Sequence, residues 1–287
     1  MSDTSRPRFR SATEETPLIR VTLILGVIGI LAVLLFAPLI VVFGEALAKG
    51  ATTAVRSLAN ADARSAIWLT LTVTALALPL NAAFGVAAAW AITKFDFRGK
   101  AFLITLIDLP FSVSPVVAGL CLVLLFGANS VIGGVLVGNG IPVIFALPGI
   151  VLATMFVTFP FVARELIPVM IEQGRAEEEA ALTLGATGWR VFVTVTLPNI
   201  RWALLYGVLL CNARAMGEFG AVAVVSGKIR GQTATMPITI EMLYNEYLSV
   251  SAFSMAALLA ALALVTLALK TFLEWRYADQ LAATHRH

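Results

Sequence analysis

Long apolar runs separated by short charged segments constrain this chain more than any other feature. The first run, residues 21–44, is about 24 residues long, and about 20 helical residues cross a ~30 Å hydrocarbon core. Hydrophobic residues make up 59 % of the chain, charged residues make up 13 %, and the mean hydropathy is +0.92. This composition is far from that of a soluble domain. The sequence therefore predicts an integral membrane protein.

The apolar runs predict an all-α protein with six transmembrane helices, a membrane domain over 21–275, and polar tails over 1–20 and 276–287. A cleaved signal peptide is the alternative for the first run, because Ala46-Leu47-Ala48 fits a cleavage site. Its apolar region would exceed the roughly 7–15 residues that such peptides use, so we expect an uncleaved span. The six expected spans are 21–44, 66–93, 102–126, 142–163, 199–225 and 252–273.

The third apolar run contains polar and helix-breaking residues in its middle. Asp108, Ser112 and Ser114 lie there together with Pro110 and Pro115. Two prolines and an acid inside a span indicate a broken helix, which is tolerated only where protein or a water-filled cavity surrounds it. Asp108, Ser112 and Ser114 are therefore candidates for lining a pathway.

The basic residues predict the orientation. With six spans and a cytoplasmic N-terminus, 14 of the 20 Lys and Arg residues fall on the cytoplasmic side. Arg214 lies inside a span, and the opposite side receives only Lys49, Arg56, Arg64, Lys228 and Arg230. This bias follows the positive-inside rule and predicts that both termini and segment 174–198 are cytoplasmic.

Segment 174–198 is a polar stretch between two spans. Three glutamates, Glu177 to Glu179, fall in a first helical turn, where the helix dipole favours carboxylates. Gly185 lies where a helix end accepts a left-handed residue, and Thr187 can begin a second helix. Small residues, including Ala180 and Ala181, would let a partner approach closely. The segment is expected to be a helix–turn–helix that docks a partner.

The same segment resembles the EAA loop of binding-protein-dependent ABC-transporter permeases. The signature runs Glu179-Ala180-Ala181, three residues, Gly185, nine residues, and then Val195-Thr196-Leu197-Pro198, with valine where isoleucine is commoner. The resemblance implies a type I importer permease fold whose loop inserts a coupling helix into a separate ATPase. It implies coupling roles for Glu179, Ala180, Ala181, Gly185, Leu197 and Pro198.

Arg214 and Glu218 form a second constellation, near the end of the fifth span. They are four residues apart and can pair on one helix face. A lone arginine at mid-membrane costs roughly 2.5–3.5 kcal/mol, so the pair has a reason to be there, either as a clasp between spans or as a gate that lines a pathway. If the pathway carries an anion, it would also need hydroxyl donors. Ser112, Ser114, Thr154 and Thr158, which lie near helix breaks, are candidates.

Residues 213–221, Ala-Arg-Ala-Met-Gly-Glu-Phe-Gly-Ala, resemble the permeases of molybdate and sulfate/thiosulfate importers. Residues 226–233 and 243–247 resemble the sulfate/thiosulfate group more closely. The resemblance implies an inner-membrane importer with two ATPase copies, a second, related permease and a periplasmic sulfate- or thiosulfate-binding protein. A molybdate permease remains the alternative.

Several functions are disfavoured by what the sequence lacks. No G-x-x-x-x-G-K-[ST] motif is present, so ATP is expected to bind a partner and this subunit is expected to be non-catalytic, without a cofactor of its own. The basic residues are scattered, which argues against nucleic-acid binding, and the only histidines, His285 and His287, predict no metal site. An ion-driven transporter using Asp108 or Arg214–Glu218 would usually show two related halves, and none is visible.

The predicted orientation is testable by cysteine labelling. Replacing Ser130, in the expected loop between the third and fourth spans, with cysteine should create a site that an impermeant reagent labels only from the outer face. Labelling from the cytoplasmic face would contradict the six-span topology.

Overall fold

The computed structural model describes residues 17–284, and all of their regular structure is helical. The long helices are α1 (Pro17–Leu47), α3 (Ala61–Lys94), α7 (Leu147–Gln173), α10 (Leu197–Met216) and α13 (Ser249–Thr284). The shorter ones are α2 (Ala51–Leu58), α4 (Lys100–Ser112), α5 (Pro115–Phe126), α6 (Val131–Gly138), α8 (Ala176–Thr183), α9 (Gly188–Val191), the π-helix η1 (Phe192–Thr196), α11 (Gly220–Val225) and α12 (Met236–Asn245). The all-α prediction is confirmed.

Within residues 17–284, five helical segments are long and apolar enough to cross a membrane. A sixth span is obtained if α4 and α5, which meet at an angle of 109°, count as one. The expected break in the third apolar run is therefore present between Ser112 and Pro115. The backbone can bend there because Pro115 has no N–H to donate to a continuing helix.

Several expected span boundaries differ from the structure. Helix α7 begins at Leu147 and not at 142, and the helical segment of the fifth span begins at Gly188 and not at 199. Helix α7, which corresponds to the fourth expected span, continues ten residues beyond the predicted end at 163. Arg164 does not end the span, because it pairs with Asp108 beside the helix. The fifth span does not run to 225 as one helix, since α10 ends at Met216 and α11 begins at Gly220. Of the predicted tails, 17–20 belong to α1 and 276–284 to α13, and residues 1–16 and 285–287 lie outside the described part.

Helices α3, α7 and α10 form the centre of the bundle. Gly85 of α3 and Gly207 of α10 both lie against Val162 of α7, where a Cβ atom would come within 2.6 and 3.2 Å of it. Small residues at such crossings let helix backbones approach closely in a membrane. One buried amide ties the three helices together: Asn81 Nδ2 donates to Thr158 Oγ1 at 2.7 Å and to Cys211 Sγ at 3.3 Å.

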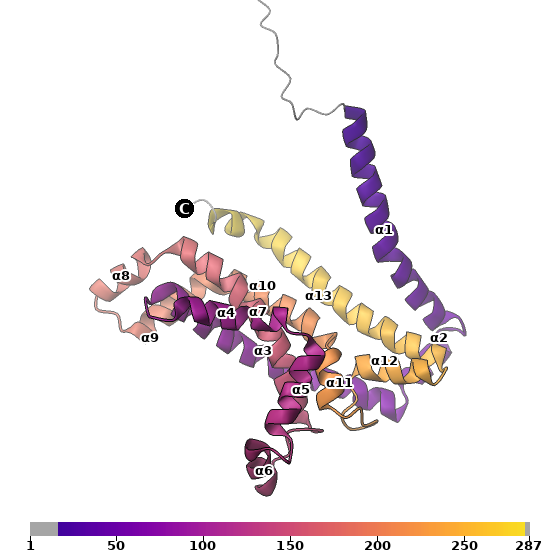
Figure 1. Ribbon diagram of the computed structural model, residues 1–287. Coiled ribbons are helices and arrows are strands. Elements are labelled where there is room, and N and C mark those ends of the chain that lie inside the picture. The colour runs from indigo at the N-terminus through magenta and orange to yellow at the C-terminus, as the bar shows by residue number, and fades with distance from the viewer. Residues whose placement is uncertain (1–16, 285–287) are drawn as a thin grey trace, which may run out of the picture.

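The bundle has two polar ends. Figure 1 shows α8 and α9 at one end, with α2 and α12 at the other. The α12 end carries ion pairs from Arg230 to Asp62 and Glu246 and from Lys228 to Glu241. The ends of α3 and α7 and the start of α10 converge on the α8 end. The hydrophilic segments of the sequence are thus sorted to two sides of an apolar body.

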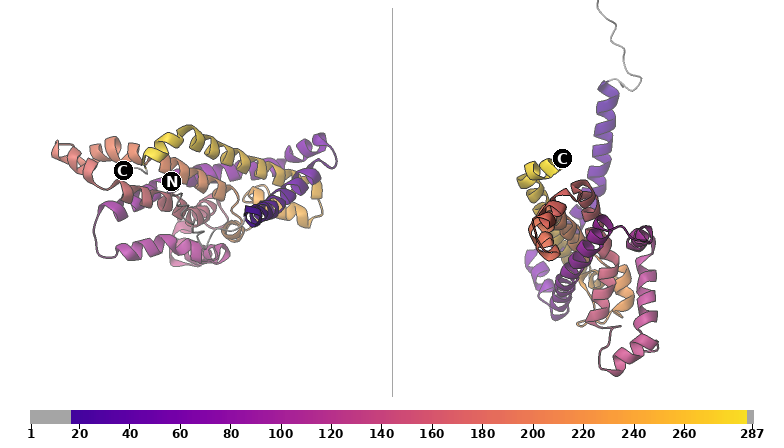
Figure 2. Two further views of the ribbon diagram at one scale, coloured as in Figure 1. Left: turned by 90° about the horizontal axis from the view of Figure 1, so that it is seen from above. Right: turned by 90° about the vertical axis from the view of Figure 1, so that its left-hand side faces the viewer.

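Helix α1 contacts α13 and projects away from the rest of the bundle in Figure 1 and in the right-hand view of Figure 2. Its side chains are almost all exposed, and none in its apolar window is buried. An apolar helix of this length is stable in hydrocarbon because its backbone groups bond within the helix.

Candidate functional site

Helix α8 and the turn after it form an exposed surface at one end of the bundle. The helix begins with the three glutamates and buries none of its residues. It ends in a Schellman motif, in which the Gly185 N–H donates to Leu182 O and the Ala186 N–H donates to Ala181 O. Gly185 has a φ of +86°, which only glycine adopts without strain. The expected helix end at Gly185 is what the structure shows.

The predicted coupling residues fall into two groups. Glu179, Ala180 and Gly185 are exposed on α8 and its turn, and Ala181 is half-buried. Leu197 and Pro198 instead begin α10, where Leu197 packs against the core and Pro198 occupies the first helical turn. The proline fits there because the first N–H groups of a helix have no internal partner. A docked partner would therefore meet the first group.

Two apolar side chains that the sequence reasoning did not single out for docking are exposed near this turn. Leu184 is 89 % exposed and Trp189, at the start of α9, is 75 % exposed. Leu184 lies on the turn after α8, whereas Trp189 is the second residue of the candidate membrane span Gly188–Met216 and stacks on Phe192. Exposed apolar side chains such as Leu184 are typical of a surface that binds another protein.

Arg214 and Glu218 pair across a helix break. Arg214 Nη1 lies 2.7 Å from Glu218 Oε2, and their side chains are 35 % and 1 % exposed. The same carboxylate accepts a hydrogen bond at Oε1 from the Ala221 N–H at 3.1 Å. Glu218 therefore lies outside α10 and accepts a hydrogen bond from the first turn of α11, which differs from the expected single helix face. The pair joins the two halves of the broken span.

The two broken spans pack against each other. Gly220, at the start of α11, lies against Pro115, where a Cβ atom would come within 2.9 Å of the proline ring, and Gly119 lies against the carbonyl of Ala221. Helices α5 and α11 therefore begin side by side. Ser112 and Ser114 flank the break and are exposed, and the Ser114 side chain does not cap α5.

Asp108 has a partner that the sequence did not reveal. Arg164 Nε donates to Asp108 Oδ1 at 2.8 Å, and the guanidinium also lies 4.9 Å from the centre of the Phe111 ring. Both charged side chains are more than a third exposed. The sequence reasoning missed Arg164 because an Arg-Glu pair after an apolar run looks like the end of a span.

Thr154 and Thr158, the other candidate hydroxyls, belong to the core. Both are buried, and each hydroxyl donates to the carbonyl four residues earlier in α7. This bond to the carbonyl four residues earlier is the usual one for serine and threonine hydroxyls in the middle of a helix. Their side chains do not line an open surface.

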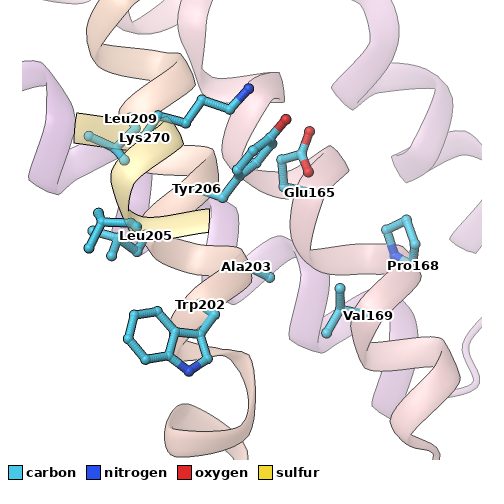
Figure 3. A pocket seen from close by; sticks show the side chains of 10 residues that line it. Glu165, Pro168, Val169, Trp202, Ala203, Leu205, Tyr206, Leu209 and Lys270 are labelled. Atoms are coloured by element: carbon cyan, nitrogen blue, oxygen red, sulfur yellow. The ribbon is translucent and has the colours of Figure 1, made fainter. Parts of the chain in front are cut away.

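A pocket of about 430 Å³ opens between α7, α10 and α13. Figure 3 shows Glu165, Tyr206 and Lys270 approaching it from these three helices. The Lys270 ammonium lies 4.5 Å from the centre of the Tyr206 ring. The remaining wall is largely apolar. Among the described residues no cluster of His, Cys, Asp or Glu could hold a metal ion.

An apolar helical body with broken inner spans and an exposed helix–turn–helix at one end is the arrangement that the sequence predicted for a transport permease. The chain belongs to the family of binding-protein-dependent transport system inner membrane components, whose family model matches residues 81–279. The predicted family membership is confirmed.

The relatives are named sulfate permeases. The chain is 52 % identical over 249 residues to the sulfate transport system permease protein CysW of Escherichia coli (strain K12), covering 87 % of this chain and 86 % of that protein. It is 53 % identical to the CysW protein of Synechocystis sp., covering 86 % and 89 %. The sulfate transport system permease protein CysT of Escherichia coli (strain K12) is 38 % identical, covering 72 % and 75 %.

Solved structures show the same fold. A bacterial ABC transporter that imports the acidic polysaccharide alginate matches with a TM-score of 0.74 at 19 % identity, covering 90 % of this chain and 96 % of that chain. Together with the family match, this confirms the predicted type I importer permease fold.

The Arg214–Glu218 pair generates a stability prediction. Arg214→Gln leaves a buried carboxylate without its counter-charge, which should lower the free energy of unfolding by about 1–3 kcal/mol, the penalty for an unsatisfied buried group. The double variant Arg214→Gln/Glu218→Gln should lose less, because no charge is stranded. Thermal unfolding of the purified protein in detergent measures both.

The exposed pair of Lys100 and Asp96 provides the control. Lys100→Gln should change stability by less than about 1 kcal/mol. Glu218→Gln is measured as the second single variant. A loss of stability in Arg214→Gln/Glu218→Gln equal to the sum of the losses in the two single variants would contradict direct pairing of Arg214 with Glu218.

Proposed function

We propose that this chain is a permease subunit of an ATP-driven importer that carries sulfate, and thiosulfate with it, across the bacterial inner membrane. The similarity to CysW sulfate permeases over most of both chains supports sulfate as the substrate. Membership of the family of binding-protein-dependent transport components supports the need for a binding protein. The exposed helix α8 supports the proposed coupling to an ATPase. A short helix with no buried residue at the water-facing end of a permease is a surface for another subunit.

The proposed assembly follows from one docking helix per chain. A transporter with two ATPase subunits needs two such helices, and hence a second permease beside this one. The similarity to CysT favours a related but different chain as that partner. A periplasmic sulfate-binding protein completes the importer, and a solved relative is likewise described in complex with a periplasmic protein. ATP binds the ATPase subunits, and this chain is non-catalytic.

The orientation is part of the proposal. The bias of Lys and Arg toward the α8 end favours a cytoplasmic α8 and cytoplasmic termini. The ATPase would then meet α8 on the side where ATP is.

The pathway residues are proposed from charge and exposure. Arg214 is partly exposed beside the break between α10 and α11, and Arg164 is exposed on α7. Asp108 and Glu218 balance these two cations, while Ser112 and Ser114 offer hydroxyl donors nearby in the chain. Paired cations let a dianion pass without binding it tightly, since the counter-carboxylates compete for the same arginines.

The substrate is tested by gene deletion. In a strain without another sulfate importer, removing this gene should abolish growth on low sulfate or thiosulfate, and added cysteine should restore it. Uptake of labelled molybdate should be unchanged. Intact sulfate uptake together with lost molybdate uptake would identify a molybdate permease instead.

Docking through α8 is tested at two glycines with equal space around them. A Cβ atom would meet nothing within 4 Å at Gly185 or at Gly188, but only Gly185 has a positive φ. Gly185→Ala should disfavour the left-handed turn by about 1–2 kcal/mol. The ratio of loops without this turn to loops with it should then rise about 5- to 30-fold. ATP-dependent sulfate uptake into proteoliposomes should fall accordingly.

Gly188→Ala is the control, because it adds the same methyl group on an ordinary backbone. It should leave sulfate uptake unchanged. Equal uptake by both variants would contradict a role for the α8 turn in coupling.

A further inference from the structure

The ion pair between Lys94 and Glu178 joins α8 to the transmembrane body. Lys94 Nζ, at the end of α3, lies 3.0 Å from Glu178 Oε2, and the two side chains are only 7 % and 15 % exposed. In seven further ion pairs of the described residues, at least one partner is more than a third exposed. Lys94 Nζ also donates to the carbonyl of Gly174, where α7 ends. One ammonium group thus connects three helices.

The second oxygen of the same carboxylate reaches the start of α10. Thr196 Oγ1 donates to Glu178 Oε1 at 2.6 Å, and Thr196 is buried. Thr196 is the last residue of η1, the π-helix that leads into α10. Single π-helical turns frequently occur at functional sites. Both oxygens of Glu178 are therefore engaged, one by a cation and one by a hydroxyl group.

Adjacent glutamates of α8 have different surroundings. Glu178 faces the bundle, and Glu179 is exposed on the surface proposed to meet the ATPase. Glu177 is exposed and accepts a hydrogen bond from Asn199. Because successive helical residues point about 100° apart, a single turn of α8 carries both an outward and an inward contact.

We propose that Glu178, Lys94 and Thr196 form a joint that makes α8 move as one body with the ends of α3 and α10. The inference rests on the proposed docking of an ATPase on α8. An isolated eight-residue helix is unstable in water, and Gly174, with a positive φ, precedes it. A displacement of α8 by the ATPase therefore passes to the transmembrane helices through side-chain contacts, of which the joint is the most enclosed.

The joint consists of positioning residues, so its test separates coupling from folding. The complete importer, with its ATPase, second permease and binding protein, is reconstituted in proteoliposomes. Two quantities are measured: sulfate transported per ATP hydrolysed, and ATPase retained on the purified permease. A purely structural role would change the amount of assembled importer but leave the transport ratio of the assembled fraction unchanged.

Glu178→Gln removes the negative charge and leaves Lys94 without its counter-ion. The ratio of sulfate transported to ATP hydrolysed should fall at least about fivefold, the lower end of ordinary coupling between sites, while the ATPase stays bound. Glu177→Gln makes the same chemical change one residue earlier on an exposed side chain and should leave the ratio unchanged. Equal ratios for these two variants would overturn the joint.

Conservative variants keep the test decisive if Glu178→Gln assembles poorly. Thr196→Val removes the hydroxyl group at nearly constant size and should lower the ratio, whereas Thr196→Ser keeps the hydroxyl and should restore it. Lys94→Arg keeps the cation and should retain more coupling than Lys94→Met. Loss of coupling in Thr196→Ser to the level of Thr196→Val would count against the joint.

A cross-linking experiment distinguishes failure of the joint from failure of the proposed docking. Ala180→Cys places a thiol on the exposed side of α8, and a bifunctional reagent should link it to the ATPase. A cross-link together with an unchanged transport ratio in Glu178→Gln would overturn the joint alone. No cross-link would overturn the docking of the ATPase, and with it the joint.

Discussion

The hydrocarbon core of a membrane offers no water to backbone groups, and the inner architecture of this protein depends on that constraint. Two of its spans are broken, at 112–115 and at 216–220. Broken backbone is tolerated at membrane depth only when protein or a water-filled cavity surrounds it. Here α5 and α11 begin against each other, and the Glu218 carboxylate accepts the Ala221 N–H at the second break. Each broken span therefore shields the backbone break of the other from lipid.

The charges inside the apolar body follow from the same constraint. Arg214 and Glu218 form an ion pair beside the second break, and Glu218 is almost completely enclosed. Asp108 and Arg164 also pair, but they remain open to the surface of the single chain. Charged groups at this depth face water or protein rather than lipid. An exposed pair on this face is consistent with the proposed second permease, whose surface would cover it or share a water-filled pathway with it.

The water-facing end combines exposure and attachment within one short helix. Gly185 lets the chain turn after α8, and Leu184 presents apolar surface beyond it. Glu178 holds the opposite side of α8 to Lys94 and Thr196. The coupling role proposed for α8 needs both properties: a partner must be able to reach the helix, and the helix must be attached firmly enough to transmit displacement. The structure supplies them on different faces of the same turn.

The sequence by itself determined the class of fold, the family and the location of the exposed helix α8 that is proposed to dock the ATPase. These depend on local properties: apolar length, the spacing of Glu179, Ala180, Ala181 and Gly185, and the glycine at the end of α8. What only the tertiary structure decided was which polar side chains meet. Arg164 finds Asp108, Lys94 finds Glu178, and Thr158 turns into the core toward Asn81. Their partners lie 56, 84 and 77 residues away along the chain, and no local pattern encodes such pairings. They arise from the way the helices cross, which depends on side-chain packing over the whole bundle.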